Sequence, residues 1–236
     1  MDHRPSVAQL VELRSYELVA GQVGAFVDHF ETHFLVSQEE LGMDVVGQFT
    51  VPGDDARFVW LRRFPEPSAR GDALARFYGG PVWQEFGPRA NELMLDHTDV
   101  HLLTPHRSAP AFAPDHVPHV AREPLADAGG TGDGPSTVVI ATYELGDAEL
   151  PAASMTTELD AAPAGSVTEV GRLVTAGVPN EFPRLPVHED VTVGVWLLSD
   201  RAAGAAATAT AEAVAVSEVL TVRTICLAPT SRSTLR

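Results

Sequence analysis

The chain carries one series of short strand patterns twice, in the same order. The patterns that begin at Val11, Val46, Val59 and Leu103 recur at Val138, Val170, Val195 and Leu227, at offsets of 127, 124, 136 and 124 residues. This near-constant offset predicts two copies of one domain, of which the second has diverged further. The increase to 136 places an insertion between the second and third strands of the second copy. Two like domains in one chain can pair as two subunits do elsewhere.

Hydrophobic periodicity in the first copy predicts four strands and two helical regions. The expected elements are a strand at 9–18, a helix at 22–41, strands at 43–51 and 56–64, a helix at 69–78, a helical segment at 83–95 and a strand at 97–104. Gly42 is expected to cap the first helix, Ser68 to cap the second, and Pro88 to kink the last helical segment. The order β-α-β-β-α-β is that of a ferredoxin-like domain.

The same patterns divide the chain into a ferredoxin-like domain at 8–106, a linker at 107–135 and a second, degenerate ferredoxin-like domain at 136–230. Helices of the second domain are expected near 148–162 and 202–216. The connection from Pro179 to His188 contains three prolines and is therefore expected to be stiff and extended. Each domain would leave one face of its sheet bare. We therefore expect an α+β fold in which the two domains bury these faces in one pseudo-dimeric α+β barrel.

Composition excludes several classes of function. The net charge of −16 repels phosphate backbones, so no nucleic-acid partner is expected. All 16 basic residues are arginine, which excludes lysine chemistry, and a single cysteine excludes a disulfide framework. No apolar stretch is long enough to cross a membrane, and the first residues do not resemble a signal peptide. A cytoplasmic protein is expected, and the lysine-free composition is typical of a GC-rich bacterial genome.

Residues of about 10–105 resemble the NIPSNAP family, within the dimeric α+β barrel superfamily. The matching segments are 11–18, Gly21, the helix that ends at Glu31-Thr32-His33, Leu41-Gly42, Val46 to Phe49, and the helix at Trp83 to Phe86. The second half retains the Tyr143-Glu144-Leu145 strand but has no equivalent of His33 or Trp83.

This resemblance implies the barrel fold more strongly than it implies a reaction. The wider superfamily includes cofactor-independent monooxygenases, polyketide cyclases, haem-degrading enzymes and muconolactone-type isomerases. In these proteins a pocket between sheet and helices holds a hydrophobic, often aromatic, small molecule.

His33 is the first candidate catalytic residue, because a neutral imidazole suits general acid–base work. His29 lies one helical turn earlier and could form a metal-binding pair with His33 if a third ligand were present. No zinc-binding signature supports such a pair, and no metal or other cofactor is expected. A partly exposed structural histidine is the simpler alternative for His33.

Arg14 is the second candidate catalytic residue. A charged residue in an apolar strand needs a partner, for which Glu12 is the obvious choice, or it could hold an anionic substrate oxygen. Substrate-binding candidates are aromatic: Tyr16, Phe30, Tyr78, Trp83 and Phe86. Aromatic residues at this spacing are as easily explained by core packing.

Two further features could carry chemistry. His97, Asp99 and His101 alternate along one predicted strand, so they are expected on one face, where they could orient a proton shuttle, bind a cation or form a solvated surface. The insertion of the second copy carries Asn180, Arg184 and His188, and could cover one end of the barrel or contact another chain.

The sequence therefore predicts a protein that transforms a small hydrophobic or aromatic metabolite without a cofactor, by oxygenation, cyclisation or isomerisation. A non-catalytic ligand-binding or assembly module is the alternative. A small-molecule ligand is the expected partner, and a homo-oligomer is possible through free strand edges.

Overall fold

The structure, a computed structural model, describes residues 9–106, 137–145, 168–200 and 220–235. The elements of the first half are β1 (Leu10–Leu18), α1 (Val23–His33), α2 (Leu35–Glu39), β2 (Asp44–Val51), β3 (Asp54–Phe64), α3 (Ala69–Gly79), α4 (Pro81–Leu93) and β4 (Met94–Pro105). The second half contributes β5 (Thr137–Leu145), β6 (Thr168–Thr175), β7 (Val193–Asp200) and β8 (Leu220–Pro229). The predicted linker and the two predicted helices of the second half lie outside the described residues.

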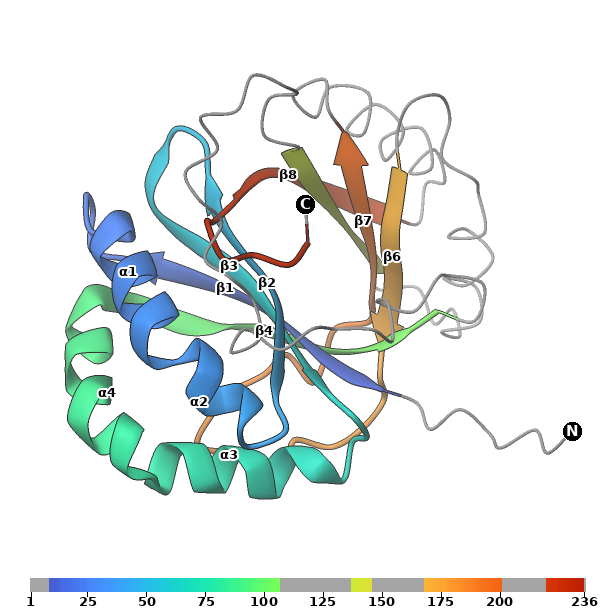
Figure 1. Ribbon diagram of the computed structural model, residues 1–236. Coiled ribbons are helices and arrows are strands. Elements are labelled where there is room, and N and C mark those ends of the chain that lie inside the picture. The colour runs from blue at the N-terminus through green and yellow to red at the C-terminus, as the bar shows by residue number, and fades with distance from the viewer. Residues whose placement is uncertain (1–8, 107–136, 146–167, 201–219, 236) are drawn as a thin grey trace, which may run out of the picture.

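The eight strands close into one antiparallel barrel in the order β1-β3-β2-β8-β5-β7-β6-β4, in which β4 pairs again with β1. Each half contributes four consecutive strands, and the halves meet where β2 pairs with β8 and β4 pairs with β6. Figure 1 shows the strands of the first half crossing the middle of the molecule, with β6, β7 and β8 on the far side from the helices. This confirms the predicted α+β barrel.

The two halves pair their strands in the same register. Arg14 lies opposite Trp60 and Ala141 opposite Trp196, while Val11 lies opposite Leu103 and Val138 opposite Leu227. The junctions between the halves match as well, since Phe49 pairs with Pro229 and Leu173 with Pro105. The offsets read from the sequence repeat carry these pairs of the first half onto their counterparts, but not the pairs beyond the register shift in β4, where Glu17 lies opposite Asp96 and Glu144 opposite Thr221. The two halves thus share most of their strand pairing, while common descent of the two halves stays a prediction.

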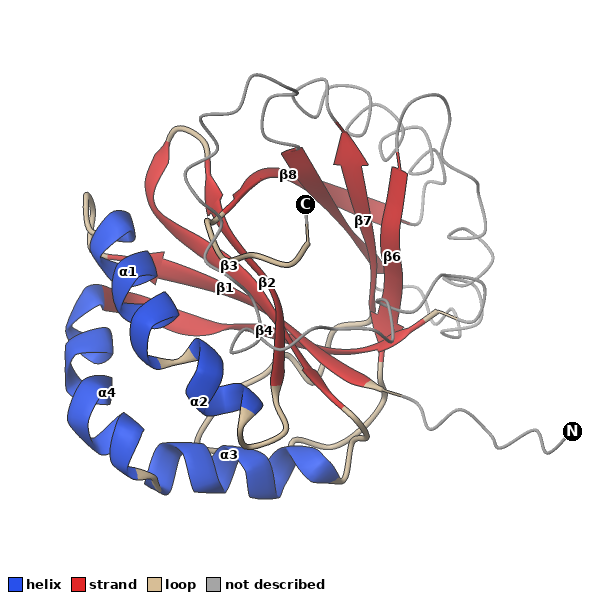
Figure 2. Cartoon of the chain, in the orientation of Figure 1, coloured by secondary structure: helices blue, strands red, loops and turns tan. Residues whose placement is uncertain are grey.

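Successive side chains of β1 point alternately to the two faces of the sheet, and each face belongs to a separate hydrophobic core. Val11 and Leu13 point into the barrel, where side chains from both halves pack together. Leu10, Tyr16 and Leu18 point to the opposite face, beneath the helices. Figure 2 shows all the described helices gathered on this one side of the strands. The first half therefore has buried side chains on both faces of its sheet.

The helices differ in detail from those predicted. The expected single helix at 22–41 is broken at Phe34, whose φ of −110° and ψ of −15° end α1 and begin α2. Ser68 stands at the N-cap of α3 but makes no side-chain capping bond, and α4 continues through Pro88. Gly42 caps as expected, with a positive φ of 81°. No helix in the described part of the chain has the length and apolar character needed to cross a bilayer.

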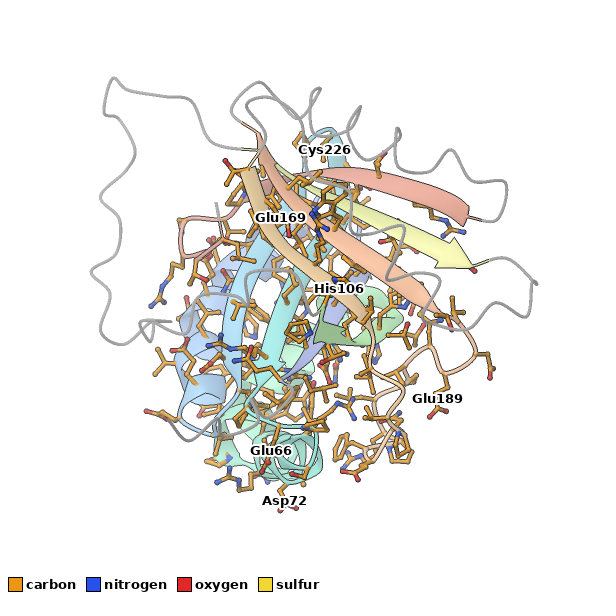
Figure 3. All side chains as sticks on the ribbon, turned by 90° about the vertical axis from the view of Figure 1, so that its right-hand side faces the viewer. Glu66, Asp72, His106, Glu169, Glu189 and Cys226 are labelled. Atoms are coloured by element: carbon orange, nitrogen blue, oxygen red, sulfur yellow. The ribbon has the colours of Figure 1, made fainter. Side chains whose placement is uncertain are left out.

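Two segments of the second half reach back to the first. The connection between β6 and β7 (residues 176–192) passes along the helical layer, where it forms the orange loop beside α3 in Figure 1. Figure 3 shows its Glu189 near the end of the molecule that carries Glu66 and Asp72, far from Glu169 and Cys226. The C-terminal tail (residues 230–235) instead binds α1, because the hydroxyls of Thr230 and Ser231 donate to the buried carboxylate of Glu31.

Candidate functional site

An aromatic cavity lies between the helices and the sheet of the first half. Its lining is Tyr16, Phe26, Phe30, Phe34, Gln38, Trp60, Phe77, Tyr78, Trp83, Ala90, Asn91, Met94, His97 and Leu185. Four of the predicted site residues are among them: Tyr16, Phe30, Tyr78 and Trp83. The cavity encloses about 50 Å³, which holds a few water molecules but not an aromatic ring. Leu185 belongs to the 176–192 connection, so the second half supplies part of the wall.

Beneath this cavity lies a buried charge cluster around Glu12 on β1. The Glu12 carboxylate accepts hydrogen bonds from Arg14 Nη1 at 2.9 Å, from Arg62 Nε at 3.0 Å and from Arg70 Nε at 2.6 Å. All four side chains are almost completely excluded from solvent. Burial alone would raise the pKa of Glu12, but the charges of Arg62, Arg14 and Arg70 together hold that pKa far below its ordinary value. Glu12 is therefore ionised in the folded protein.

The cluster carries more positive than negative charge. Three guanidinium groups face one carboxylate, and within the described residues Glu12 is the acidic partner of all three. Gln38 and Asn180 accept further hydrogen bonds from Arg62 and Arg70, but both are neutral. No described group accepts a hydrogen bond from Arg14 Nη2 or Arg70 Nη2, although both atoms are buried. Unpaired buried donors and unbalanced charge are costly, so this region favours an additional anion.

Tyr16 connects the charge cluster to the cavity. Its hydroxyl accepts a hydrogen bond of 2.9 Å from Arg14 Nε, and its ring lines the cavity. Because that oxygen acts as an acceptor for Arg14, its own proton is free to be donated to a ligand. Burial raises the pKa of Tyr78 above its usual value, so Tyr78 also keeps its proton at neutral pH. Arg14 itself lies behind Tyr16 and does not line the cavity.

The structure separates His33 from this cavity. The ring of His33 stacks on Phe86 with centroids 3.7 Å apart and an interplanar angle of 10°, and neither residue lines the cavity. His29 lies beside His33, with ring centroids 4.8 Å apart, and its Nε2 is 2.9 Å from the carbonyl oxygen of Phe86. Burial and the neighbouring His29 lower the pKa of His33. The sequence allowed Tyr78, Trp83 and Phe86 to line one aromatic pocket with His33, but of these four residues only Tyr78 and Trp83 line the cavity.

His97 is the histidine that lines the cavity. Its ring centroid lies 6.3 Å from that of Tyr16, in an edge-to-face arrangement. Burial lowers the pKa of His97, and the charge of Arg14 lowers it further, so the ring is neutral at pH 7. The sequence had placed His97 on the same face as Asp99 and His101, which is wrong. The register of β1 against β4 shifts between Ser15 and Glu17, and this bulge turns His97 to the helical side.

A second pocket of about 310 Å³ lies on the barrel side of the sheet. Both halves line it, through Leu13, Ser15, Arg57, Val59, Asp99, His101, Ile140, Thr142, Arg223, Thr224 and Ile225. At its edge, His188 from the 176–192 connection approaches Asp99, with 3.0 Å between His188 Nε2 and Asp99 Oδ1. Burial and the nearby His188 lower the pKa of His101, while Asp99 opposes the shift. The sequence pointed to the strand with Asp99 and His101, and separately to the connection with His188, but it gave no indication that the two lie together.

Comparison with known proteins identifies the first half. The NIPSNAP family model matches residues 11–110, which contain the aromatic cavity's helices and the buried cluster around Glu12. Residues 11–110 belong to the NIPSNAP family. No curated protein sequence matches the chain at a significant level.

Solved NIPSNAP structures are similar to about half of the chain. A NIPSNAP family protein of unknown function from Agrobacterium tumefaciens is 23% identical, with a TM-score of 0.40, and the match covers 48% of this chain and 98% of that one. An uncharacterized NIPSNAP domain protein from Burkholderia xenovorans is 26% identical, with a TM-score of 0.38, and the match covers 45% of this chain and 99% of that one.

Other structures match almost the whole chain. A provisionally named monooxygenase from Fusobacterium nucleatum has a TM-score of 0.55 at 6% identity, over 94% of this chain and 93% of that one. One from Lactobacillus acidophilus has a TM-score of 0.51 at 9% identity, over 94% of each chain. At these identities the likeness shows the fold alone.

Proposed function

We propose that the NIPSNAP domain binds a small aromatic molecule that carries, or develops, a negative charge, and transforms it without a cofactor. The observation that supports this proposal is the excess positive charge buried beneath the aromatic cavity. An apolar cavity with a few convergent polar groups is typical of small-molecule sites. Here Tyr16 and Gln38, which line the cavity, are hydrogen-bonded to buried arginines behind them, and that positive charge favours a carboxylate, a phenolate or an enolate as the ligand.

The roles of the residues follow from their positions. Tyr16 donates its hydroxyl proton to the ligand oxygen, and Arg14 stabilises the arrangement from behind through its bond to Tyr16 Oη. Phe30 and Trp83 supply apolar walls, and Tyr78 a further hydroxyl. His97, neutral and at the cavity, is the best-placed base. Acid–base catalysis by His33 stays a prediction. His33 has no role in this proposal, because its ring stacks on Phe86 and does not line the cavity.

Removal of the hydroxyl proton of a phenol gives a phenolate, and removal of a proton from the carbon next to a carbonyl gives an enolate. Either anion can begin cofactor-independent oxygenation, cyclisation or isomerisation. A buried hydrogen-bond donor backed by a guanidinium stabilises such an anion more strongly than water does. These three reactions are therefore the candidates, and the geometry of the cavity does not favour one above the others.

A ligand must enlarge the cavity before it can enter. The wall formed by Tyr78 and Trp83 flanks the corner between α3 and α4, where Gly80 has an extended φ of −83° and ψ of 167°. Outward movement of this corner would separate Tyr78 from Phe182, whose rings stack with centroids 5.9 Å apart. We expect the α3–α4 corner to open when a ligand binds.

The test is a comparison of two probes of similar size, benzoate and benzyl alcohol. Each is titrated into the protein while tryptophan fluorescence and the thermal unfolding temperature are followed. We expect benzoate to shift both readouts at lower concentration than benzyl alcohol does, because only benzoate offers a charge to the cluster. Tyr16→Phe keeps the ring and removes the donated proton, so it should abolish this preference.

Arg76→Met serves as the control, because Arg76 is exposed and binds only the Leu41 carbonyl oxygen among the described groups. This variant should keep the preference for benzoate. Equal responses to the two probes in the wild-type protein would refute the proposal. That result would favour the second candidate, a non-catalytic assembly module, which the nearly filled cavity supports.

A further inference from the structure

Three potential metal ligands meet at the boundary of the two halves, on the barrel side of β4. They are Asp99 and His101 of β4 and His188 of the 176–192 connection, and their donor atoms all lie within 4.8 Å of one another. His188 Nε2 is 3.0 Å and His101 Nε2 is 3.7 Å from Asp99 Oδ1. The two imidazole rings stack at 29° with centroids 4.6 Å apart. This group will be called the His–Asp–His cluster.

We propose that the His–Asp–His cluster binds a divalent transition-metal ion, with Zn²⁺ as the representative case. Two imidazoles and one carboxylate are the donor set of open zinc sites and of mononuclear iron sites. Donors at about 2.0–2.2 Å from a tetrahedral ion lie roughly 3.4 Å from one another. The two separations from Asp99 Oδ1 bracket that value, and all the donor atoms lie within 4.8 Å of one another, so an approach of the two rings toward a common centre would complete three coordination positions.

The main chain holds these residues in place before any ion binds. Asp99 and His101 are two residues apart on β4 and therefore point to the same face. The His188 amide donates to the Val100 carbonyl oxygen at 2.8 Å, which fixes the connection directly beside the strand. Pro186, two residues before His188, limits the freedom of the approach. The cluster is thus assembled from both halves, and an ion bound there would clamp them together.

The remaining coordination positions of the ion would face the 310 Å³ pocket, which Asp99 and His101 help to line. Arg57 and Arg223 line the same pocket, so an anion such as a small carboxylate could bind beside the ion. This pocket lies on the opposite face of the sheet from the aromatic cavity. The metal site is therefore independent of the proposed function, and departs from the sequence-based expectation of no metal.

The test uses the full-length protein without a histidine tag, after treatment with a chelator, and the metal ion alone as the probe. Zn²⁺ affinity is measured by calorimetry, and Co²⁺ is added to read the ligand field from visible absorption. We expect one ion per chain and a rise in the thermal unfolding temperature on addition of Zn²⁺. His188→Gln should weaken Zn²⁺ binding by at least about 100-fold, because even residues that only orient a ligand contribute 10–100-fold.

His29→Gln is the matched control, because His29 also lies beside a second histidine, His33. It should leave Zn²⁺ affinity and the Co²⁺ spectrum unchanged. Asp99 and His188 are about half exposed, so their replacement should not prevent folding. Stoichiometric binding that survives His188→Gln, or the absence of binding in the wild-type protein at about 100 µM Zn²⁺, would show that the cluster is only a hydrogen-bonded contact between the halves.

Discussion

Replacement of Glu12 by glutamine tests whether the buried cluster is as unbalanced as its geometry indicates. Glu12→Gln keeps the size of the side chain and removes the one negative charge that contacts Arg14, Arg62 and Arg70. Removal of one partner from a single buried ion pair costs about 3–5 kcal/mol. Three guanidinium groups lose their partner at once here, so the expected loss is at least about 5 kcal/mol. That is comparable to the whole stability of many domains, about 5–15 kcal/mol.

The decisive comparison is with a variant that removes the arginine of the Glu12–Arg14 ion pair instead of its glutamate. Arg14→Met also removes the 2.9 Å pair with Glu12, but leaves Glu12 bound to Arg62 and Arg70 and lowers the excess positive charge. The methionine retains most of the apolar packing of the arginine stem beside Trp60. We expect this variant to lose only about 1–2 kcal/mol, since it leaves no buried carboxylate unpaired. The two substitutions should therefore differ by about 3 kcal/mol or more.

Urea unfolding followed by tryptophan fluorescence measures both values, because Trp60 and Trp196 are buried in the folded state. Glu92→Gln is the matched control, since Glu92 pairs with Arg89 at the surface and should contribute less than about 1 kcal/mol. Equal losses for Glu12→Gln and Arg14→Met would refute the reasoning. Equal losses would mean that the cluster around Glu12 carries no excess positive charge for a ligand to neutralise.

The pH dependence supplies a second readout of the same substitution. The pKa of Glu12 is far lower in the folded protein than the value of about 4.3 expected for the unfolded chain. Its stabilisation is therefore fully present above about pH 4.3 and is lost as the pH falls through the folded pKa. Below pH 4 the wild-type protein should lose up to about 1.4 kcal/mol per pH unit from this one group. Glu12→Gln should lack that component of the slope.

Three other substitutions test the packing around the cavity. Gly87→Ala would place a Cβ 2.7 Å from the Trp83 indole, so it should displace that ring and increase acrylamide quenching of tryptophan fluorescence; unchanged quenching would contradict the contact. Leu185→Ala should lower the urea-derived stability by about 2–5 kcal/mol although Leu185 belongs to the second half, whereas the exposed Leu95→Ala should change it by less than about 0.5 kcal/mol. Glu31→Gln should speed hydrogen exchange in residues 230–235, which its carboxylate binds, and a tail with unchanged exchange would oppose that role.

The barrel of eight strands could be predicted from the sequence, because strand patterns show where each strand lies and the β-α-β-β-α-β order defines the fold. The register could not, because the repeat shows only that Trp60 and Trp196 occupy equivalent positions, opposite Arg14 and Ala141. Helix ends were harder to predict. The break at Phe34 falls within an uninterrupted apolar pattern, and it is accompanied by a bond of 2.7 Å from Ser37 Oγ to the His33 carbonyl oxygen. Hydrophobic periodicity does not show where a side chain such as Ser37 binds a main-chain carbonyl oxygen of its own helix.

The sequence named part of the cavity wall. Tyr16, Phe30, Tyr78 and Trp83 line one cavity, and their role in substrate binding stays a prediction. Helix and strand periods indicate which face of an element a residue occupies, but not which faces of different elements meet. His97 was misplaced because one extra residue in β4 reverses the face, and no residue type announces that bulge. The three arginines around Glu12 come from separate elements, so only the folded chain shows that they outnumber their partner.

The insertion in the second half explains why one half alone would be incomplete. The offset increases from 124 to 136 residues between the second and third strand patterns, and those extra residues lengthen the connection from β6 to β7. Three of its side chains each contact a different part of the first half: Asn180 binds Arg70, Leu185 closes the aromatic cavity, and His188 meets Asp99. A symmetric dimer would repeat such a loop on both sides. In the described residues this connection reaches the helical layer from one side only, so fusion of two halves allows one of them to be completed by the other.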